Sequence, residues 1–423
     1  MKDVRNALLA IAVAVSLAAC AVGPDFHRPA PPAADRYTAN ALPATTVAAD
    51  TAHGGAQQFE PGQDVPAAWW RAFGSPQLNA LVEQALRANP DLQAADAALR
   101  QAQQTLAAQR GAWLPQADLH VDASRQRDSV VPAPDAGIDT PYALRTAQLS
   151  VSYTLDVFGG TRRQVEAADA QAQAQAAVPG LAKLLEQQRT LLAILGGHLP
   201  SDAAGEALTL DTLQLPAQLP LSLPSRLVDR RPDIRAAEAQ AHAASALIGV
   251  AAAARLPSIT LSAASGGSAS SVGRMFAAGN TQWSVAGSLL QPLFHGGALA
   301  HQQRAAEAGY MQAMAHYRSV VLNAFGEVSN ALTALQGDAQ SLRACADAQA
   351  LAERTLALVQ RQHAVGAVGM ADLLQAQQAF QSTQAATVQA QAARYADTVA
   401  LYQALGGGPW WSPAAQTPKP AVP

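Results

Sequence analysis

The chain has 423 residues, of which 49% are hydrophobic and only 14% are charged, well below the roughly 25% charged residues of ordinary soluble domains. No stretch supplies the roughly 20 apolar residues that a membrane-spanning helix needs, which excludes a many-helix membrane protein. The formal net charge of −3 gives no basic surface for nucleic acid, so that class of partner is excluded too.

The first element is an amino-terminal signal. Basic residues precede an apolar run over residues 7–19 that is too short to cross a bilayer, and small residues lead directly into Cys20. This pattern resembles a bacterial lipoprotein signal, in which the cysteine is lipidated and becomes the first residue of the mature chain. We predict removal of residues 1–19 and a covalent lipid on Cys20. Ala21 follows, which in such lipoproteins is compatible with transfer to the outer membrane.

Residues 20–74 are predicted to be an extended segment that runs over the surface. Pro, Ala, Thr and Gly are frequent there and show little periodicity. The first strong helix signal follows at Ser75 and Pro76, a cap and a first helical residue, and it stops before Asn89.

One unit occurs twice in the chain. Residues 89–119 recur as residues 231–261, and a Pro-Asp pair and a Leu-Pro pair match at the same offset of 142. Each copy predicts an Ala-rich helix that begins at Pro and ends at Leu-Pro, followed by strands. We therefore divide the chain into a signal peptide, an extended segment, a first repeat, a linker, a second repeat and a loose tail: residues 1–19, 20–74, 75–197, 198–224, 225–408 and 409–423.

Four segments alternate between apolar and polar residues, namely 116–124, 148–155, 258–265 and 282–291. The alternation predicts either an ordinary antiparallel sheet with one solvated face or membrane strands with lipid on one side and water on the other. Four strands are too few to close a barrel, for which about eight is the usual minimum, and an open edge is not tolerated in lipid. Three chains would supply twelve strands.

The longest predicted element follows the last of these strands. Between residue 298 and about residue 366 no turn signal occurs, and apolar residues recur at alternating spacings of three and four. At 1.5 Å per residue this predicts a helix of about 100 Å. The chain then reverses and returns as a second helix from residue 372 to about 405. Cys345 falls on the apolar seam, so we interpret it as a small buried residue and not as a nucleophile.

These features together resemble the TolC-type outer membrane factors, specifically the NodT-like lipoprotein branch of tripartite multidrug efflux systems. The resemblance covers nearly the whole mature chain, and it is the order of the motifs that makes it specific. The matching segments are residues 20–29 after the signal, 69–73 before the first helix, 229–233 at the second repeat, 292–297 after the last strand, 361–377 at the hairpin and 405–408 at the end.

The resemblance implies a mainly α protein with membrane β: long α-helical coiled-coil hairpins and four strands per protomer, contributing to a trimeric twelve-stranded outer membrane barrel. It implies a passive conduit for drugs or other small molecules, with a periplasmic adaptor (membrane fusion) protein and an inner-membrane RND-type pump as partners. It also implies an acidic gate at the hairpin tips. Asp372 is the nearest acid, and it is either a pore-lining residue or a solvated residue at a helix N-terminus, where the dipole favours it. Gln375 holds the position that is acidic in some relatives. The adaptor-facing turn would be Val365, Gly366 and Ala367, and glycine is needed for the reversal of the backbone whether or not a partner docks there.

The two copies of the repeat differ in length after their strands. Residues 167–168 match 305–306 at an offset of 138, but residues 195–197 match 405–407 at an offset of 210, so the first copy lacks about 72 residues. The loss falls near residues 171–179 and removes the lower part and tip of the first hairpin. Either the chain is a family member with an incomplete tunnel wall and impaired assembly or pumping, or the short form is a gene deletion or an artefact.

Three rival functions remain for comparison. An enzyme is not expected, because the nine histidines are scattered and no metal, nucleophile or nucleotide motif occurs; for the same reason no cofactor and no metal is expected. A lipid-anchored periplasmic coiled-coil scaffold would keep the heptads but has no use for four alternating segments. A type I protein secretion channel shares the fold, although the lipoprotein signal favours drug efflux.

Overall fold

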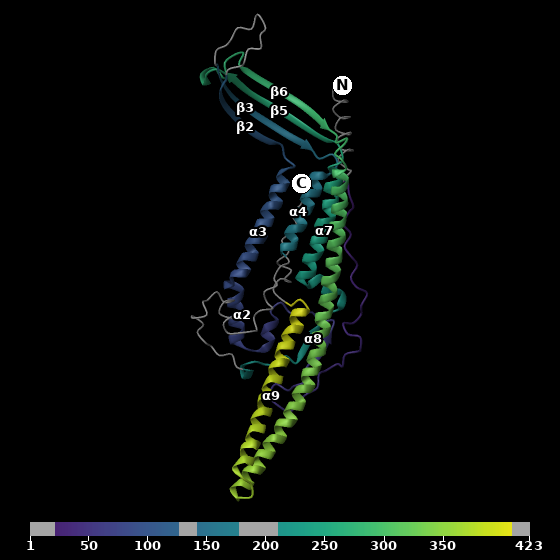
Figure 1. Ribbon diagram of the computed structural model, residues 1–423, viewed down its shortest axis with the longest axis vertical. Coiled ribbons are helices and arrows are strands. Elements are labelled where there is room, and N and C mark those ends of the chain that lie inside the picture. Colours follow the sequence, from purple (N-terminus) through teal and green to yellow (C-terminus); the bar gives the residue numbers. More distant parts are fainter. Residues whose placement is uncertain (1–21, 127–141, 177–209, 408–423) are drawn as a thin grey trace. The chain divides into compact units, whose positions relative to one another are not determined.

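The computed structural model describes residues 22–126, 142–176 and 210–407 (Figure 1). Helices account for most of these residues, and within these ranges no helix has the length and apolar character needed to cross a membrane. The principal elements in chain order are β1 (Gln58–Pro61), η1 (Trp69–Phe73), α2 (Pro76–Ala88), α3 (Pro90–Gly111), β2 (Gln116–Gln126), β3 (Tyr142–Leu155), α4 (Gly160–Ala176), η4 (Leu210–Thr212), β4 (Gln218–Leu221), α6 (Pro224–Arg230), α7 (Pro232–Ala253), β5 (Ser258–Ala269), η5 (Val272–Arg274), β6 (Thr281–Leu290), α8 (Ala298–Ala364) and α9 (Met370–Ala404).

The duplicated unit folds the same way twice, as α3–β2–β3–α4 and as α7–β5–β6–α8. Both copies begin with proline as the first helical residue, Pro90 and Pro232, where a backbone N–H would have no partner within the helix. Ser75 caps the preceding helix α2, since its hydroxyl oxygen accepts a hydrogen bond from the Leu78 amide at 3.3 Å. The predicted order of helix and strands is therefore confirmed in both copies.

The four alternating segments form one antiparallel sheet in the order β2-β3-β5-β6. Two strands are longer than the alternation indicates: β3 begins at Tyr142 and β5 continues to Ala269. The backbone ladder explains the difference, because it runs on to the pair Arg145 and Ala269 although the side chains there have lost the alternating pattern.

A second sheet of two parallel strands, β1 and β4, is not visible in the sequence pattern. It pairs Phe59 with Leu219, and these side chains are 5% and 0% exposed. The expected surface course of residues 20–74 is therefore wrong for this stretch, which contributes to a core. Strands of four residues are too short for a period of two to be recognised.

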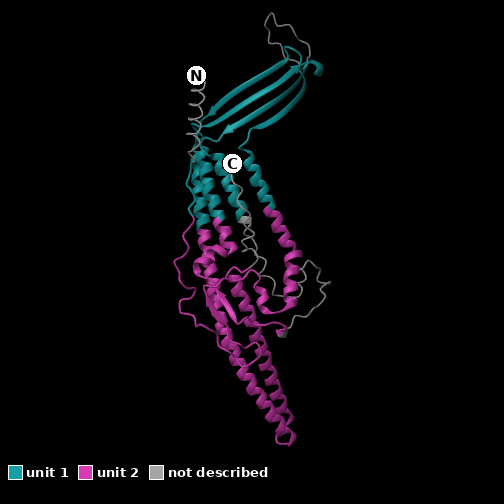
Figure 2. Cartoon of the chain, turned by 180° about the vertical axis from the view of Figure 1, so that it is seen from behind, with its two compact units in different colours: residues 1–27, 100–173, 239–314 teal, residues 28–99, 174–238, 315–423 magenta. Residues whose placement is uncertain are grey.

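The chain divides into two compact units (Figure 2). Unit 1 comprises Met1–His27, Arg100–Gln173 and Ala239–Met314, and it contains the four-stranded sheet. Unit 2 comprises Arg28–Leu99, Ala174–Glu238 and Ala315–Pro423, and it contains the two-stranded sheet and most of α8 and α9. Each unit takes segments from both repeats, so a repeat is not a separate compact unit.

The helices α8 and α9 form the long hairpin. The 67 residues of α8 give a length of about 100 Å, as predicted. Its seam is confirmed in unit 2, where the predicted positions are buried: Tyr317, Val321, Ala324, Val328, Ala331, Leu335 and Leu342. Cys345 is only half-buried, contrary to the prediction. The reason is local, because no described residue of α8 beyond Leu342 is fully covered within one chain.

Candidate functional site

The register of the four-stranded sheet gathers apolar side chains on one face. Residues that stand opposite one another in paired strands share a face, and Val151, Ala263 and Val285 form one such row across three strands. The neighbouring rows on this face are mainly apolar: Leu119 with Leu149, Tyr153 with Leu261, and Leu155 with Ile259 and Leu289, while Ser265 stands between Leu149 and Trp283. The predicted alternation therefore extends over the whole width of the sheet.

The opposite face of the sheet is polar. Thr154 Oγ1 lies 3.4 Å from Thr260 Oγ1, and Thr146 Oγ1 lies 3.3 Å from Ser268 Oγ. Its rows combine amide, hydroxyl and ionisable side chains: Gln116 with Ser152 and Ser262, Asp118 with Ser150, and His120 with Gln148. One sheet thus separates a water-compatible face from an apolar face.

The apolar face is exposed in the single chain. Trp283, Val285 and Leu289 are 79%, 74% and 66% exposed. An antiparallel sheet of a soluble protein buries its apolar face on a core, and a contiguous exposed apolar surface of this kind marks contact with lipid or protein. Of the two interpretations of the alternating segments, the membrane sheet is the one that accounts for this exposure.

The apolar face also has a suitable height. On β3 its rows run from Ala147 to Leu155, which is about 27 Å at roughly 3.4 Å per residue. With the 35–45° tilt of barrel strands this becomes about 20 Å, close to the roughly 25 Å apolar band of outer membrane barrels. Arg145 follows on the same face, and its Nη1 donates to the Ser270 carbonyl at 3.1 Å. A charged side chain therefore marks the far end of the band.

The hairpin turn brings together the residues predicted to face an adaptor. Gly366 has a φ of 74°, which only glycine adopts readily, so the predicted need for glycine in the reversal is confirmed. The Ala367 amide donates to the Gln362 carbonyl at 2.8 Å. Val365 is 79% exposed at the same turn. These contacts give a short, well-connected tip with an apolar side chain in solvent.

The predicted gate residues lie on the first turns of α9. Asp372 caps the helix, because its Oδ2 accepts a hydrogen bond from the Gly369 amide at 3.0 Å, and its carboxylate lies where the helix dipole favours a negative charge. Gln375 is exposed one turn further on. A constriction would need several chains, so the gate remains a prediction. Cys20, the predicted lipidation site, lies outside the described residues.

Sequence reasoning missed a buried arginine on α9. Arg394 is 1% exposed, and it donates to the carbonyls of His53 at 3.2 Å and Gly55 at 2.9 Å and to Gln57 Oε1 at 3.2 Å. Burial lowers its pKa, although a guanidinium remains charged at neutral pH. Arg394 lies in the 4,3 spacing of the buried residues Thr387, Gln391, Thr398 and Leu401 on α9. A charged residue at such a position is the signal that could have identified the site.

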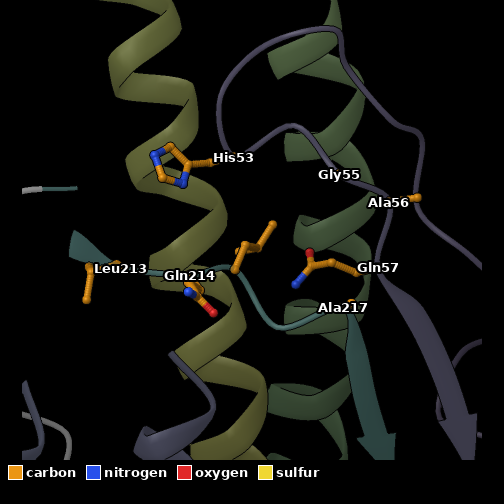
Figure 3. A pocket seen from close by; sticks show the side chains of 8 residues that line it. His53, Gly55, Ala56, Gln57, Leu213, Gln214 and Ala217 are labelled. Atoms are coloured by element: carbon orange, nitrogen blue, oxygen red, sulfur yellow. The ribbon is translucent and has the colours of Figure 1, made fainter. Parts of the chain in front are cut away.

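Arg394 fixes a loop of the amino-terminal segment beside a pocket of about 370 Å³ (Figure 3). Gln57 is fully buried there, and its amide nitrogen donates to the Pro216 carbonyl at 3.1 Å and to Thr398 Oγ1 at 3.2 Å. The lining residues are His53, Gly55, Ala56, Gln57, Leu213, Gln214, Leu215 and Ala217. Hydrogen bonds from α9 therefore hold the loop that precedes β1, and through Gln57 they are connected to the segment that precedes β4.

Two carboxyl groups face each other across the hairpin. Burial and, after it, the hydrogen bond and charge of the neighbouring Asp397 carboxyl together raise the pKa of Asp338 to about 6, while the charge of Arg394 opposes the rise. The ordinary value in an unfolded chain is about 3.9. The folded hairpin therefore binds a proton more tightly than the unfolded chain does between these values, and its stability falls as the pH rises from about 4 to about 6.

We expect the Asp338→Asn variant to lose this dependence, since an amide resembles the protonated carboxyl. Its helical signal should melt at the same temperature at pH 4.5 and pH 7, whereas the parent chain should melt at a lower temperature at pH 7 than at pH 4.5. Circular dichroism of the purified protein provides the measurement. Asp347, an exposed aspartate on the same helix, gives the control Asp347→Asn, which should behave as the parent chain. Equal pH dependence in both variants would contradict the assignment to Asp338.

Comparison with known proteins agrees with this geometry. The family model described as outer membrane efflux protein matches residues 81–192 and 223–407, and the first matched segment is the shorter one. The pyoverdine export outer membrane protein OpmQ of Pseudomonas putida is 33% identical, over 80% of this chain and 88% of the relative. The toluene efflux pump outer membrane protein TtgC of Pseudomonas putida is 29% identical over 97% of both chains.

Solved structures share the fold. The outer-membrane channel OprN superposes with a TM-score of 0.77 at 24% identity, covering 92% of this chain and 100% of that one. The outer membrane protein VceC from Vibrio cholerae superposes with a TM-score of 0.73 at 24% identity, covering 82% and 100%. Helical hairpins combined with a strand pair in each repeat are thus the common architecture. The chain belongs to the outer membrane efflux protein family and is an outer membrane component of an efflux pump.

Proposed function

We propose that this chain is the outer membrane channel of a tripartite efflux pump and works as a homotrimer. The observation that carries the proposal is a sheet with one apolar face, one polar face and two edges, β2 and β6, that have no further partner among the described strands. Joining β6 of one copy to β2 of the next, three times, gives a closed barrel of twelve strands. Closure satisfies the edge hydrogen bonds, puts the apolar face in lipid and encloses water.

The transported compounds would be small molecules. The names of two relatives refer to pyoverdine export and toluene efflux, which supports this class over secreted proteins. Such a channel requires no enzymatic step. The polar face of the sheet would only line the water-filled passage, and the inner-membrane pump would select the compounds that are exported. A type I protein secretion channel with the same fold is the alternative that the experiment below must separate.

Periplasmic contacts would be made by the hairpin. On α8 the exposed side chains of Leu351 and Leu358 are seven residues apart, and exposed Val365 follows seven residues later in the turn. This spacing defines a second face of the hairpin that α9 does not cover. We assign this face to a neighbouring hairpin of the trimer. The tip at Val365, Gly366 and Ala367 is assigned to a periplasmic adaptor that links the channel to an inner-membrane RND-type pump.

Two further features belong to the proposed assembly. A covalent lipid on Cys20 would anchor the chain in the outer membrane. The three Asp372 carboxylates, one from each copy, would approach one another at the closed tip, with Gln375 beside them, and their repulsion would favour opening. Asp372→Asn should then lower the fraction of time that the channels spend open in planar bilayers, whereas an unchanged open fraction would remove Asp372 from the gate.

The first hairpin is predicted to be shortened, and residues 177–209, which include part of it, lie outside the described residues. A shortened hairpin would limit the proposed channel. The alignment with TtgC extends over 490 positions, more than the 423 residues of this chain, so the relative has residues that this chain lacks. A trimer would hold three full hairpins and three short ones, leaving the tunnel wall incomplete and pumping impaired. Sequencing the gene again from genomic DNA tests the short form itself, since a reading frame with the extra residues would show it to be an artefact.

The decisive functional test is complementation. The chain is expressed in a strain that lacks its outer membrane efflux channel but keeps the adaptor and pump, and the minimal inhibitory concentrations of exported compounds are measured. We expect partial restoration of resistance together with a trimer in crosslinked outer membranes. A chain that restores secretion of a type I substrate and leaves resistance unchanged would overturn the efflux assignment. A chain that stays monomeric would overturn the trimer.

A further inference from the structure

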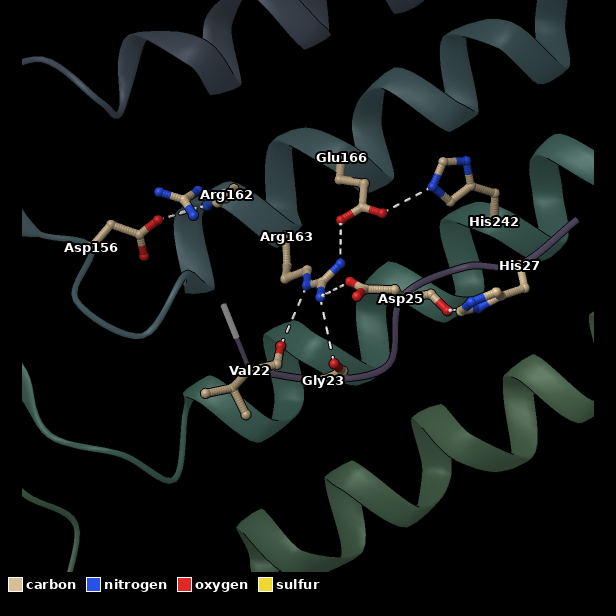
Figure 4. A network of polar contacts seen from close by, with 9 residues as sticks. All are labelled: Val22, Gly23, Asp25, His27, Asp156, Arg162, Arg163, Glu166 and His242. Carbon is tan, nitrogen blue, oxygen red and sulfur yellow. Dashed lines mark hydrogen bonds and ion pairs between the residues drawn. The ribbon is translucent and has the colours of Figure 1, made fainter. Parts of the chain in front are cut away.

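The segment that directly follows the predicted lipidation site is held in place by side chains of unit 1 (Figure 4). We call residues 22–27 the strap. The Val22 amide donates to the Phe158 carbonyl at 3.2 Å. Gly23 has a φ of 109°, and a Cβ there would lie 2.5 Å from the Gly249 Cα, so the strap passes over α7 at a distance that only glycine allows.

Arg163 of α4 is the centre of this contact. Its side chain is 6% exposed, and each of its three nitrogens has an acceptor. Nε donates to the Val22 carbonyl at 3.4 Å, Nη2 donates to Asp25 Oδ1 at 2.9 Å and to the Gly23 carbonyl at 3.5 Å, and Nη1 donates to Glu166 Oε2 at 2.7 Å. Three of these four hydrogen bonds go to the strap, so the strap supplies most of the acceptors that satisfy the buried guanidinium.

The strap also contacts the second repeat. Glu166 Oε1 lies 2.9 Å from Nε2 of His242 on α7. The Phe26 ring stacks on the His242 ring, with centroids 4.6 Å apart and an interplanar angle of 15°. The strap therefore joins α4, which belongs to the first repeat, to α7, which belongs to the second, through one continuous set of polar and aromatic contacts.

The strap lies close to one end of the four-stranded sheet. Phe158 follows the end of β3 by three residues, and the register places this end of β3 beside the start of β5 and the end of β6. Exposed apolar residues cluster in sequence around these same strand ends: Leu114 before β2, and Leu290, Leu293 and Phe294 at and after the end of β6. Of these, Phe294 belongs to the aromatic class that flanks the apolar band of membrane strands at the interface with water.

Cys20 is two residues from Val22, and two residues of extended chain span at most about 7 Å. We propose that Arg163, with Glu166 and His242, forms a receptor for the chain's own lipid-bearing amino terminus, and that it holds the acyl group at the helix-side end of the apolar face. This inference rests on the proposed lipidation of Cys20. The acyl chains then enter the bilayer leaflet that lies at these strand ends. The lipid therefore anchors the chain and also sets the position of the sheet in the bilayer.

Hydrogen–deuterium exchange of the purified trimer, read by mass spectrometry on the amino-terminal peptide, tests the receptor. We expect the amides of the strap to exchange about 10- to 100-fold faster in Arg163→Gln than in the parent chain, since charge-assisted hydrogen bonds are removed. Arg304, an exposed arginine of α8, gives the control Arg304→Gln, which should exchange as the parent does. Strap protection that survives Arg163→Gln would overturn the proposal.

A second variant covers the case in which Arg163→Gln fails to assemble. The Asp25 side chain is 84% exposed, so Asp25→Asn weakens one strap contact and leaves every residue of α4 unchanged. It should raise the exchange rate of the strap amides by a smaller factor than Arg163→Gln does. The mass of the same peptide reports acylation separately. An unmodified Cys20 with a protected strap would contradict the lipidation and leave the binding site in place, whereas an acylated Cys20 with an unprotected strap in the parent chain would contradict the receptor.

Discussion

Replacing Val285 by arginine should abolish insertion of this protein into the outer membrane. Val285 lies in the middle of β6 on the apolar face and is 74% exposed. A positive charge at the midplane of a barrel costs about 2–4 kcal/mol, and three distant copies in a trimer add to about 6–12 kcal/mol. The measurement is the amount of heat-resistant trimer in isolated outer membranes, which should fall below detection.

Ser284→Arg is the matched control. Ser284 precedes Val285 on the same strand and stands opposite Ala264, on the polar face of the sheet. In the proposed barrel its side chain points into water, so the same charge should leave the trimer at close to the parent level and change conductance instead. Loss of the trimer in Ser284→Arg with tolerance of Val285→Arg would reverse the assignment of the two faces.

The second large effect is expected at Arg394. Arg394→Met keeps most of the side-chain volume but leaves the acceptors of His53, Gly55 and Gln57 without their donor. The Gln57 acceptor is buried, and leaving it unsatisfied costs about 1–3 kcal/mol, while each of the two part-buried hydrogen bonds to His53 and Gly55 contributes about 0.5–1.5 kcal/mol. The loss should therefore be about 2–6 kcal/mol of hairpin stability. Thermal unfolding followed by circular dichroism measures it, together with cleavage of residues 46–57 by a protease.

Arg354→Met serves as the control for this prediction. Arg354 lies on α8 and is exposed, so its replacement should change the melting temperature little. If Arg394→Met melts with the parent chain and residues 46–57 stay resistant to protease, Arg394 does not hold the amino-terminal segment in the way that its contacts indicate.

Local patterns were sufficient for the main elements. The alternation of Leu149, Val151 and Tyr153 with polar residues predicts β3 and, through the duplication, the sheet of which it is part. The spacing from Tyr317 to Leu342 predicts the buried face of α8. In both cases the signal comes from one segment whose side chains alternate between two environments, and such a signal does not depend on knowing the partner.

Contacts between distant segments were not predictable in this way. β1 and β4 are four residues each and are joined by pairing across about 160 positions of sequence, with Phe59 and Leu219 as their only buried apolar pair. Arg394 appears in the sequence as an isolated arginine on the Ala-rich α9, and Arg163 as the second of two neighbouring arginines at the start of α4. Both arginines donate hydrogen bonds to backbone carbonyl groups of the amino-terminal segment. Every residue type has a backbone carbonyl, so the sequence does not show which residues will accept such a bond.

The half-buried state of Cys345 has a related cause. The predicted heptad register places Cys345 on the seam, but burial there needs a helix on each side, and the described part of one chain supplies only α9 (Figure 1). The lower hairpin is therefore where the proposed trimer would change exposure most, because Leu351 and Leu358 are 66% and 52% exposed in the single chain.

Cysteine labelling along β3 tests most directly whether this sheet is the wall of a membrane channel. Leu149, Ser150, Val151 and Ser152 are replaced by cysteine one at a time in a Cys345→Ser background, and outer membranes are treated with a water-soluble maleimide. A channel wall predicts rapid labelling at positions 150 and 152 and protection at 149 and 151. Equal labelling at all four positions, or protection at 150 and 152, would contradict it.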